Sequence, residues 1–111
     1  MITIRSIRSA IVRRSDEFSF TEEPPTVHHR PRMAAGDVAS EIVGAYAIAT
    51  LSDDSTRVWH FDTRSLDAST RLTWEQRRST FNIGHLREET YKNQVRSYAF
   101  LTLAKEGIFR S

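Results

Sequence analysis

The stretch 42-IVGAYAIATLSDDSTRVWHFD-62 decides the fold of this 111-residue chain. Its middle, residues 52–55 (SDDS), has the composition of a tight turn. After the turn, Trp59 and Phe61 alternate with smaller or polar residues, which is the two-residue period of a strand. We therefore predict a β-hairpin with one strand over residues 42–51 and the other over residues 56–62.

The residues before the turn also fit a helix. A helix would place Val38, Ile42 and Tyr46 on one face, with Asp37 as its N-cap. A strand would be buried on both sides, and alanines at positions 45, 47 and 49 would make one side shallow enough for a helix to pack closely. The turn and the alternation after it favour the strand, while a helix over residues 37–44 that leads into the strand stays open.

Outward from the hairpin, the amino-terminal residues 1–14 are predicted to form another strand. Ile2 and Ile4 alternate there with polar residues. The segment is also rich in Arg and Ser, free of acids, and has isoleucines at helical spacing, which is the composition of a transit peptide; we favour the strand. A short strand over residues 18–21 and a Pro-containing connecting loop over residues 22–36 are expected to follow.

From Thr63 onward the pattern becomes helical. Thr73 and Gln76 form a capping box, which predicts a helix from Trp74 to Asn82 with Gly84 beyond its end. The sequence therefore predicts a helix in this region that is separate from the one that follows.

A second helix is predicted from Leu86 to Lys105, with Gly107 as its stop. One face of this helix carries Tyr91, Val95, Tyr98, Ala99 and Thr102. The last turns are apolar all round, which predicts burial inside the domain or against a partner. We expect a single α+β domain (residues 1–111), in which a small antiparallel sheet of the N-terminal strand and the central hairpin packs against two C-terminal helices.

The composition excludes several classes of protein. The chain has no cysteine, which rules out a disulfide framework, thiolate zinc sites and cysteine nucleophiles. No apolar run approaches the roughly 20 residues of a membrane span, so we expect no membrane segment. The lack of cysteine and of a signal peptide favours a reducing cytoplasm.

The charge is small in sum and uneven along the chain. The formal net charge is +2, and basic segments at 1–15 and 63–87 alternate with acidic segments at 16–23 and 37–62. All basic residues except Lys92 and Lys105 are arginine, which is a residue enriched at interfaces, although the codon use of a GC-rich genome produces the same bias.

The segment from residue 71 to residue 87 interleaves guanidinium and aromatic side chains. It contains Arg71, Trp74, Arg77, Arg78, Phe81, His85 and Arg87. Such a surface stacks bases, contacts phosphates or forms a hot spot for a protein partner. The alternative is that Trp74 and Phe81 are core residues with the arginines at the edge. A helix-turn-helix that turns at residues 83–85 is disfavoured, because Glu88 and Glu89 would then face the phosphate backbone.

Signals for catalysis are weak. His60 and Asp62 would share one side of a strand, and with His85 they are the candidate residues of a metal-dependent hydrolase. The sequence has no metal-ligand motif with established spacing, no nucleophile elbow and no glycine-rich phosphate loop. We therefore expect neither an enzyme nor a bound cofactor.

These observations favour a non-catalytic protein-binding regulator or inhibitor that covers a surface on a larger assembly, a class that includes anti-defence proteins of phages and mobile elements. The predicted contact residues are Asp53, Asp54, Arg71, Trp74, Arg77, Arg78 and Arg87. The alternative is a basic nucleic-acid-binding protein. That protein would use Arg5, Arg8, Arg13, Arg14, Arg77 and Arg78.

Overall fold

The computed structural model describes residues 1–31, 41–70 and 83–110, and its centre is a three-stranded antiparallel sheet. The strands are β1 (Ile4–Arg13), β4 (Ile42–Leu51) and β5 (Thr56–Asp62), in the order β1-β4-β5. The predicted hairpin strands are confirmed to the residue, and the N-terminal segment is the predicted strand. β4 therefore lies in the middle of the sheet, while β1 and β5 form its two edges.

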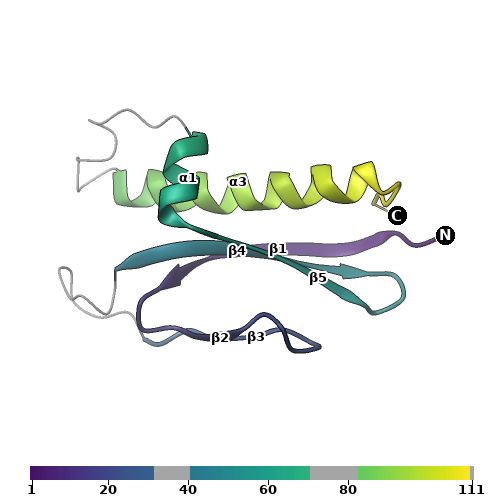
Figure 1. Cartoon of the computed structure of the whole chain (residues 1–111), viewed down its shortest axis with the longest axis horizontal. Coiled ribbons are helices and arrows are strands. Elements are labelled where there is room, and N and C mark those ends of the chain that lie inside the picture. Colours follow the sequence, from purple (N-terminus) through teal and green to yellow (C-terminus); the bar gives the residue numbers. More distant parts are fainter. Residues whose placement is uncertain (32–40, 71–82, 111) are drawn as a thin grey trace.

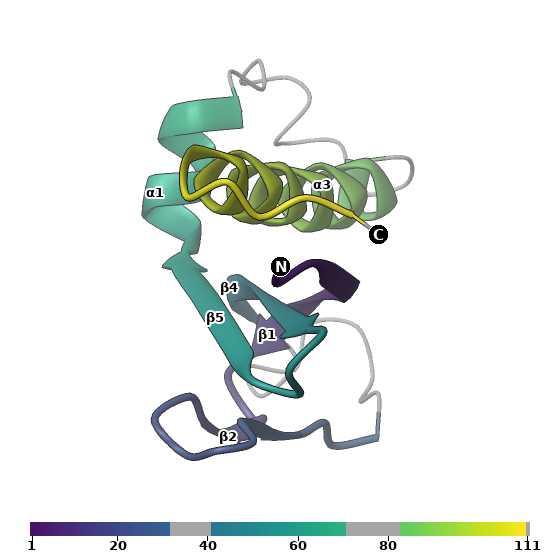
Figure 2. The ribbon, with the colours of Figure 1, turned by 90° about the vertical axis from the view of Figure 1, so that its right-hand side faces the viewer.

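The sheet lies between two layers of different thickness (Figures 1 and 2). The long helix α3 (Ile83–Lys105) covers one face. A short ribbon of β2 (Glu17–Ser19) and β3 (Thr26–His28) covers the other. Helix α1 (Thr63–Thr70) follows directly after β5 and packs against α3. The expected α+β architecture, an antiparallel sheet against C-terminal helices, is confirmed.

The helix side of the sheet holds the larger core. Ala45, Ala47 and Ala49 of β4 are completely buried beneath α3. Because an alanine has only one methyl group, the helix approaches this strand closely. The helix contributes one side chain per turn to this core, namely Tyr91, Val95, Ala99 and Leu103, all of them fully buried. Tyr98, which was predicted to lie on the same face, is instead 48% exposed.

The ribbon side of the sheet has a smaller core. Val12, Tyr46 and Ile48 are buried there, and Phe20 and Val27 from the ribbon pack against them. Gly44 is required on this side, because a Cβ atom at this position would overlap the carbonyl oxygen of Phe61. The segment 22–36 was predicted to be a loop, but it includes β3, because its first two prolines precede the strand and do not interrupt it.

The helical region differs from the prediction at one end and agrees at the other. Residues 83–85, expected to be a turn, belong to α3, because a glycine such as Gly84 costs a helix only about 1 kcal/mol. The helix predicted over residues 74–82 lies outside the described residues. Helix α3 ends at Lys105 as predicted, where Gly107 has a φ of 77° and the amide of Ile108 donates to Leu103 over 2.9 Å, which closes a Schellman motif.

Candidate functional site

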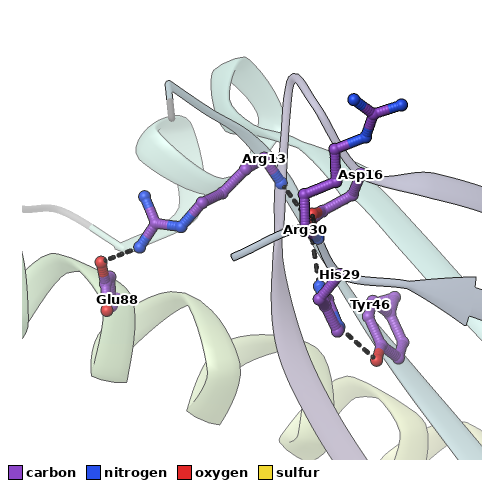
Figure 3. A network of polar contacts seen from close by, with 6 residues as sticks. All are labelled: Arg13, Asp16, His29, Arg30, Tyr46 and Glu88. Atoms are coloured by element: carbon purple, nitrogen blue, oxygen red, sulfur yellow. Dashed lines mark hydrogen bonds and ion pairs between the residues drawn. The ribbon is translucent and has the colours of Figure 1, made fainter. Parts of the chain in front are cut away.

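A buried carboxylate connects the ribbon to the sheet (Figure 3). The side chain of Asp16, in the turn between β1 and β2, is only 2% exposed. It accepts hydrogen bonds from the backbone amides of Arg13 (2.8 Å) and Arg30 (3.3 Å). It also accepts one from Nδ1 of His29 over 3.0 Å. Because an ionised carboxylate only accepts, Nδ1 of His29 carries a proton in this contact.

The other ring nitrogen of His29 faces a tyrosine of the central strand. Nε2 lies 3.3 Å from the hydroxyl of Tyr46, and the two rings are stacked at 6.1 Å between centroids. An Asp-His-Tyr series has the order of a proton relay. However, Tyr46 is only 6% exposed, and burial raises the pKa of its hydroxyl, with Arg8 opposing this shift. The hydroxyl therefore stays protonated and inaccessible, and the series serves to attach residues 16–30 to β4.

A half-buried ion pair lies beside this network. The guanidinium of Arg13 donates to Glu88 of α3 over 2.6 Å, and the two side chains are 23% and 21% exposed. Together with Asp16, His29 and Arg30 they line a recess of about 260 Å³. The charges of Arg13 and Glu88 are therefore paired within the chain. The residues around this recess connect β1, the ribbon and α3 to one another (Figure 3).

A partly exposed apolar surface lies at the opposite edge of the sheet, where β5 and α3 pack together. We call it the β5–α3 groove and define it by Trp59 and Phe61 of β5 and by Tyr98 and Leu101 of α3. Trp59 and Phe61 are only partly covered, and Tyr98 and Leu101 are 48% and 64% exposed. Phe61 and Tyr98 meet edge to face at 5.0 Å. One aromatic wall is therefore fixed, while much of the groove faces solvent.

The groove deepens at the end where helix α1 begins. Its recess there has a volume of about 180 Å³ and is lined by Phe61, Ser65, Leu66, Gln94 and Tyr98. Asp62 fixes the start of α1, because its Oδ1 accepts the amide of Ser65 over 2.8 Å as an N-cap. This hydrogen bond lowers the pKa of Asp62. The carboxylate that sequence analysis considered as a metal ligand therefore has a structural partner.

The opposite end of the groove is charged. Arg57 binds Glu106 through both of its terminal nitrogens, over 3.1 and 2.7 Å. The hydrogen bonds lower the pKa of Glu106 and raise that of Arg57. The guanidinium also lies 6.0 Å from the ring centroid of Trp59. Lys105 is exposed nearby on α3, and within the described residues it forms no ion pair.

The arginines proposed for nucleic-acid binding are mostly paired. Arg5 binds Asp54, Arg13 binds Glu88, and Arg14 binds Glu41 over 2.7 Å. Only Arg8 of this set has no ion pair with the described part of the chain. Arg77 and Arg78 lie outside the described residues. The basic strand is therefore largely neutralised by acids from other segments.

The acidic turn proposed as a contact surface is also used by the fold. Asp53 accepts the amide and the hydroxyl of Ser55, and these hydrogen bonds lower the pKa of its carboxyl group. Asp54 has a φ of 67° and binds Arg5. Both carboxylates nevertheless remain exposed, so they keep access to solvent while they hold the turn.

Arg87, the last residue of the predicted arginine and aromatic cluster, connects the two helices. It binds Asp67 of α1 over 3.1 Å and donates to the hydroxyl of Tyr91. Tyr91 in turn donates to Asp67, and burial together with this contact raises the pKa of Tyr91 to about 12. The other members, Arg71, Trp74, Arg77, Arg78 and Phe81, lie outside the described residues, as does the side chain of His85.

His60 packs against the ribbon. Its ring lies 5.0 Å from that of Phe20 and 5.5 Å from that of Phe18. This desolvation lowers the pKa of His60, and Asp62 opposes the shift. Within residues 1–31, 41–70 and 83–110, no three His, Asp or Glu side chains converge on a point that could hold a metal ion.

Comparisons with protein-family models, with curated proteins and with solved structures find no match to this chain. None of the described helices is long and apolar enough to span a membrane.

Two features of the structure were not predicted from the sequence: the polar network around Asp16 and the exposed apolar residues of the β5–α3 groove. Asp16, His29 and Tyr46 come from three separate segments, and no spacing rule connects them. Tyr98 was predicted to share a helix face with residues that are buried, whereas Leu101 was anticipated in part, because the apolar last turns of the helix predicted burial within the domain or against a partner.

Proposed function

We propose that the chain is a non-catalytic protein-binding module that regulates or inhibits a larger assembly by covering one of its surfaces, and that the β5–α3 groove is its contact surface. The observation that carries this proposal is the exposure of Tyr98 (48%), which contacts the partly covered Phe61, and of Leu101 (64%) one turn further along α3. Contiguous exposed apolar side chains of this kind mark protein interaction sites.

The composition of the groove supports a protein partner. Trp and Tyr are the residues that contribute most often to interface hot spots, because they bury a large rigid area and keep a polar group. The centre of the groove is uncharged, and Arg57, Glu106 and Lys105 surround one end of it. An apolar centre with a polar rim is the usual anatomy of a protein interface.

The other exposed apolar residues support an interface less well. Phe18, one of the other exposed apolar residues, stacks on Phe20 in the ribbon. The recess of about 180 Å³ adjoins Phe61 and Tyr98 in the groove.

Nucleic-acid binding has less support. Phosphate contacts require arginines whose charge is available, since affinity depends on neutralising phosphates and releasing their counterions. Arg5, Arg13 and Arg14 each already bind an acid of this chain. These ion pairs would have to compete with every phosphate contact.

The experiment is affinity capture from cells of the native host, analysed by quantitative mass spectrometry. The test variant carries Tyr98→Glu and Leu101→Glu, which introduce two negative charges into the groove. The control is Arg96→Glu, which makes the same change in net charge at an exposed position on the other side of α3. Far-UV circular dichroism and thermal unfolding establish that each variant is folded.

The proposal expects at least one protein that the wild type and the control capture and that the groove variant loses by tenfold or more, because two hot-spot side chains each contribute about 2 kcal/mol. Equal capture by all three proteins would contradict it. If the captured material is instead nucleic acid that is released when the salt concentration is raised, the nucleic-acid alternative would replace the proposal.

A further inference from the structure

β5 has an unpaired side that runs along the groove. Figure 2 shows the strand along one side of the sheet, with α1 rising from its end. The amide of Leu51 donates to the carbonyl of Ser55, and antiparallel pairs alternate along the ladder from there. The backbone N–H and C=O groups of Trp59 and Phe61 therefore bond to β4, while those of Val58 and His60 point outward. In the described part of the chain no backbone group bonds to this outer side.

The middle of this edge lacks the features that protect edge strands from pairing. Proteins blunt such edges with charges, prolines or bulges. Between Arg57 and Asp62, β5 has the sequence Val-Trp-His-Phe, and its register with β4 shows no bulge. An unprotected apolar edge either leads to aggregation or serves to bind a strand of another chain.

We infer that the partner contributes an extended segment that pairs with the outer edge of β5 as a fourth strand. This inference rests on the proposed function and specifies its mode of binding. Successive side chains of a strand point to opposite faces, so every second residue of the segment would lie on the helix side, beside Trp59 and Phe61. The backbone supplies affinity, and the alternate side chains supply specificity.

The groove defines the chemistry of that segment. Its recess of about 180 Å³ accommodates a large aliphatic or aromatic side chain, since a cavity of about 150 Å³ is sufficient for benzene. Cations stand at both ends: Lys105 near the Arg57–Glu106 pair, and Arg64 two residues beyond the end of β5. Both are exposed, and within the described residues neither forms an ion pair. The segment is therefore expected to have apolar residues at alternate positions, followed or preceded by an acidic residue.

The experiment selects peptides from a phage-displayed library of random twelve-residue sequences on the full chain. Enriched peptides should show the alternating apolar pattern with a flanking Asp or Glu. A synthetic peptide of the enriched sequence is then titrated into isotopically labelled protein. Amide hydrogen exchange followed by NMR should show new protection at Val58 and His60, because their outward N–H groups become hydrogen-bonded.

The matched variants are Val58→Pro and Val58→Ala. Both remove the branched valine side chain, but only the proline also removes the outward N–H, and it leaves the bonds to β4 in place. Peptide affinity should fall about tenfold or more with proline relative to alanine, since one buried hydrogen bond and the fit of the added strand are lost together. If the proline variant does not fold, the amide exchange rates of Val58 and His60 in the wild type, compared with and without peptide, test whether the peptide pairs with β5.

Three results would overturn the inference. One is selection of no binding peptide, and another is binding that leaves the exchange of Val58 and His60 unchanged. The third is concentration-dependent protection of these amides without peptide, which would show that a second copy of this chain occupies the edge. In the second case the loss of capture by the Tyr98→Glu, Leu101→Glu variant would still support the groove as a contact surface, so failure of the two proposals can be distinguished.

Discussion

The two edges of the sheet are treated differently. At one end of β1, the amide of Ile4 donates to Phe109 over 2.8 Å, and Ile4 forms a parallel bridge with Arg110. At the other end, the amide of Arg13 donates to Asp16. The register of β1 with β4 also shifts at both ends. β5 has none of these contacts among the described residues and lies beside exposed aromatic and aliphatic side chains.

Under the proposed function, this difference explains how one small sheet can be stable and still bind a partner. The chain uses its own C-terminal residues and a buried carboxylate to occupy the ends of β1, and Arg5 and Arg8 place charges along it. The same devices are absent from the middle of β5. We therefore interpret β1 as the edge that stabilises the fold, and β5 as the edge that we propose for partner binding.

The largest expected effect is the loss of the carboxylate that holds one end of β1. Asp16→Ala should lower the free energy of unfolding by about 3 kcal/mol, because the Arg13 and Arg30 amides and Nδ1 of His29 together lose one shared, buried carboxylate acceptor. Urea denaturation measures this change. Asp16→Asn, which keeps an acceptor oxygen, should lose clearly less. Equal unfolding midpoints for wild type and Asp16→Ala would mean that this contact does not hold the edge.

A second substitution acts on the pairing of β5 with β4. Gly44→Ala should destabilise the chain by about 2 kcal/mol, because the added methyl group overlaps the carbonyl oxygen of Phe61 and lies 3.1 Å from Nε2 of His60. The strand would have to shift away from β4. Thermal unfolding measures the loss of stability. The control is Ala45→Gly at the neighbouring position, which changes backbone flexibility without adding an overlapping atom. An unchanged unfolding temperature for Gly44→Ala would contradict the close approach of the two strands.

A third change opens the protected edge. Removing residues 109–111 deletes the acceptor of the Ile4 amide and the bridge at Arg110, and should cost about 1 kcal/mol. Amide exchange at Ile4 should accelerate, whereas exchange at Val58 and His60 should stay as it is. Acceleration at both edges would show that the deletion unfolds the sheet as a whole and that the two edges are not independent.

The smallest effect concerns pH and His60. Its pKa is lowered in the folded chain, so the unfolded chain binds more protons as the pH falls below about 6.5. The stabilisation by neutral His60 is complete above this pH and is lost between it and the lower folded pKa. Unfolding midpoints measured from pH 7.5 to pH 5.5 should decrease, and His60→Gln should reduce the decrease. An identical pH profile for the variant would exclude this contribution.

The hairpin could be predicted from the sequence because its information is local. The turn residues 52–55 and the alternation through Trp59 and Phe61 specify both strands without reference to the rest of the chain. The position of β5 at the edge of the sheet could not be predicted in this way, because it depends on which strands pair. The two-residue period of the side chains is the same in a central strand and in an edge strand. The exposure of Tyr98 follows from that arrangement, since at the edge of the sheet Phe61 covers only one side of its ring in the described part of the chain.

The polar network could not be predicted for a related reason. Asp16, His29 and Tyr46 are far apart in the sequence and have different chemical types, so only the folded chain shows their connection. The pairing of Arg13 with Glu88 is equally non-local. The alternating charge segments predict an uneven charge but not which residues pair, and the support for nucleic-acid binding depends on those ion pairs.

The most direct test of the central claim uses the complex with the captured protein. Hydrogen exchange of the wild-type chain should be measured with and without that protein, and the protection compared between the two edges. The account predicts new protection at Val58 and His60 of β5 and in the last turns of α3, with none between Ser6 and Val12 of β1. Protection confined to β1, with β5 unchanged, would contradict it.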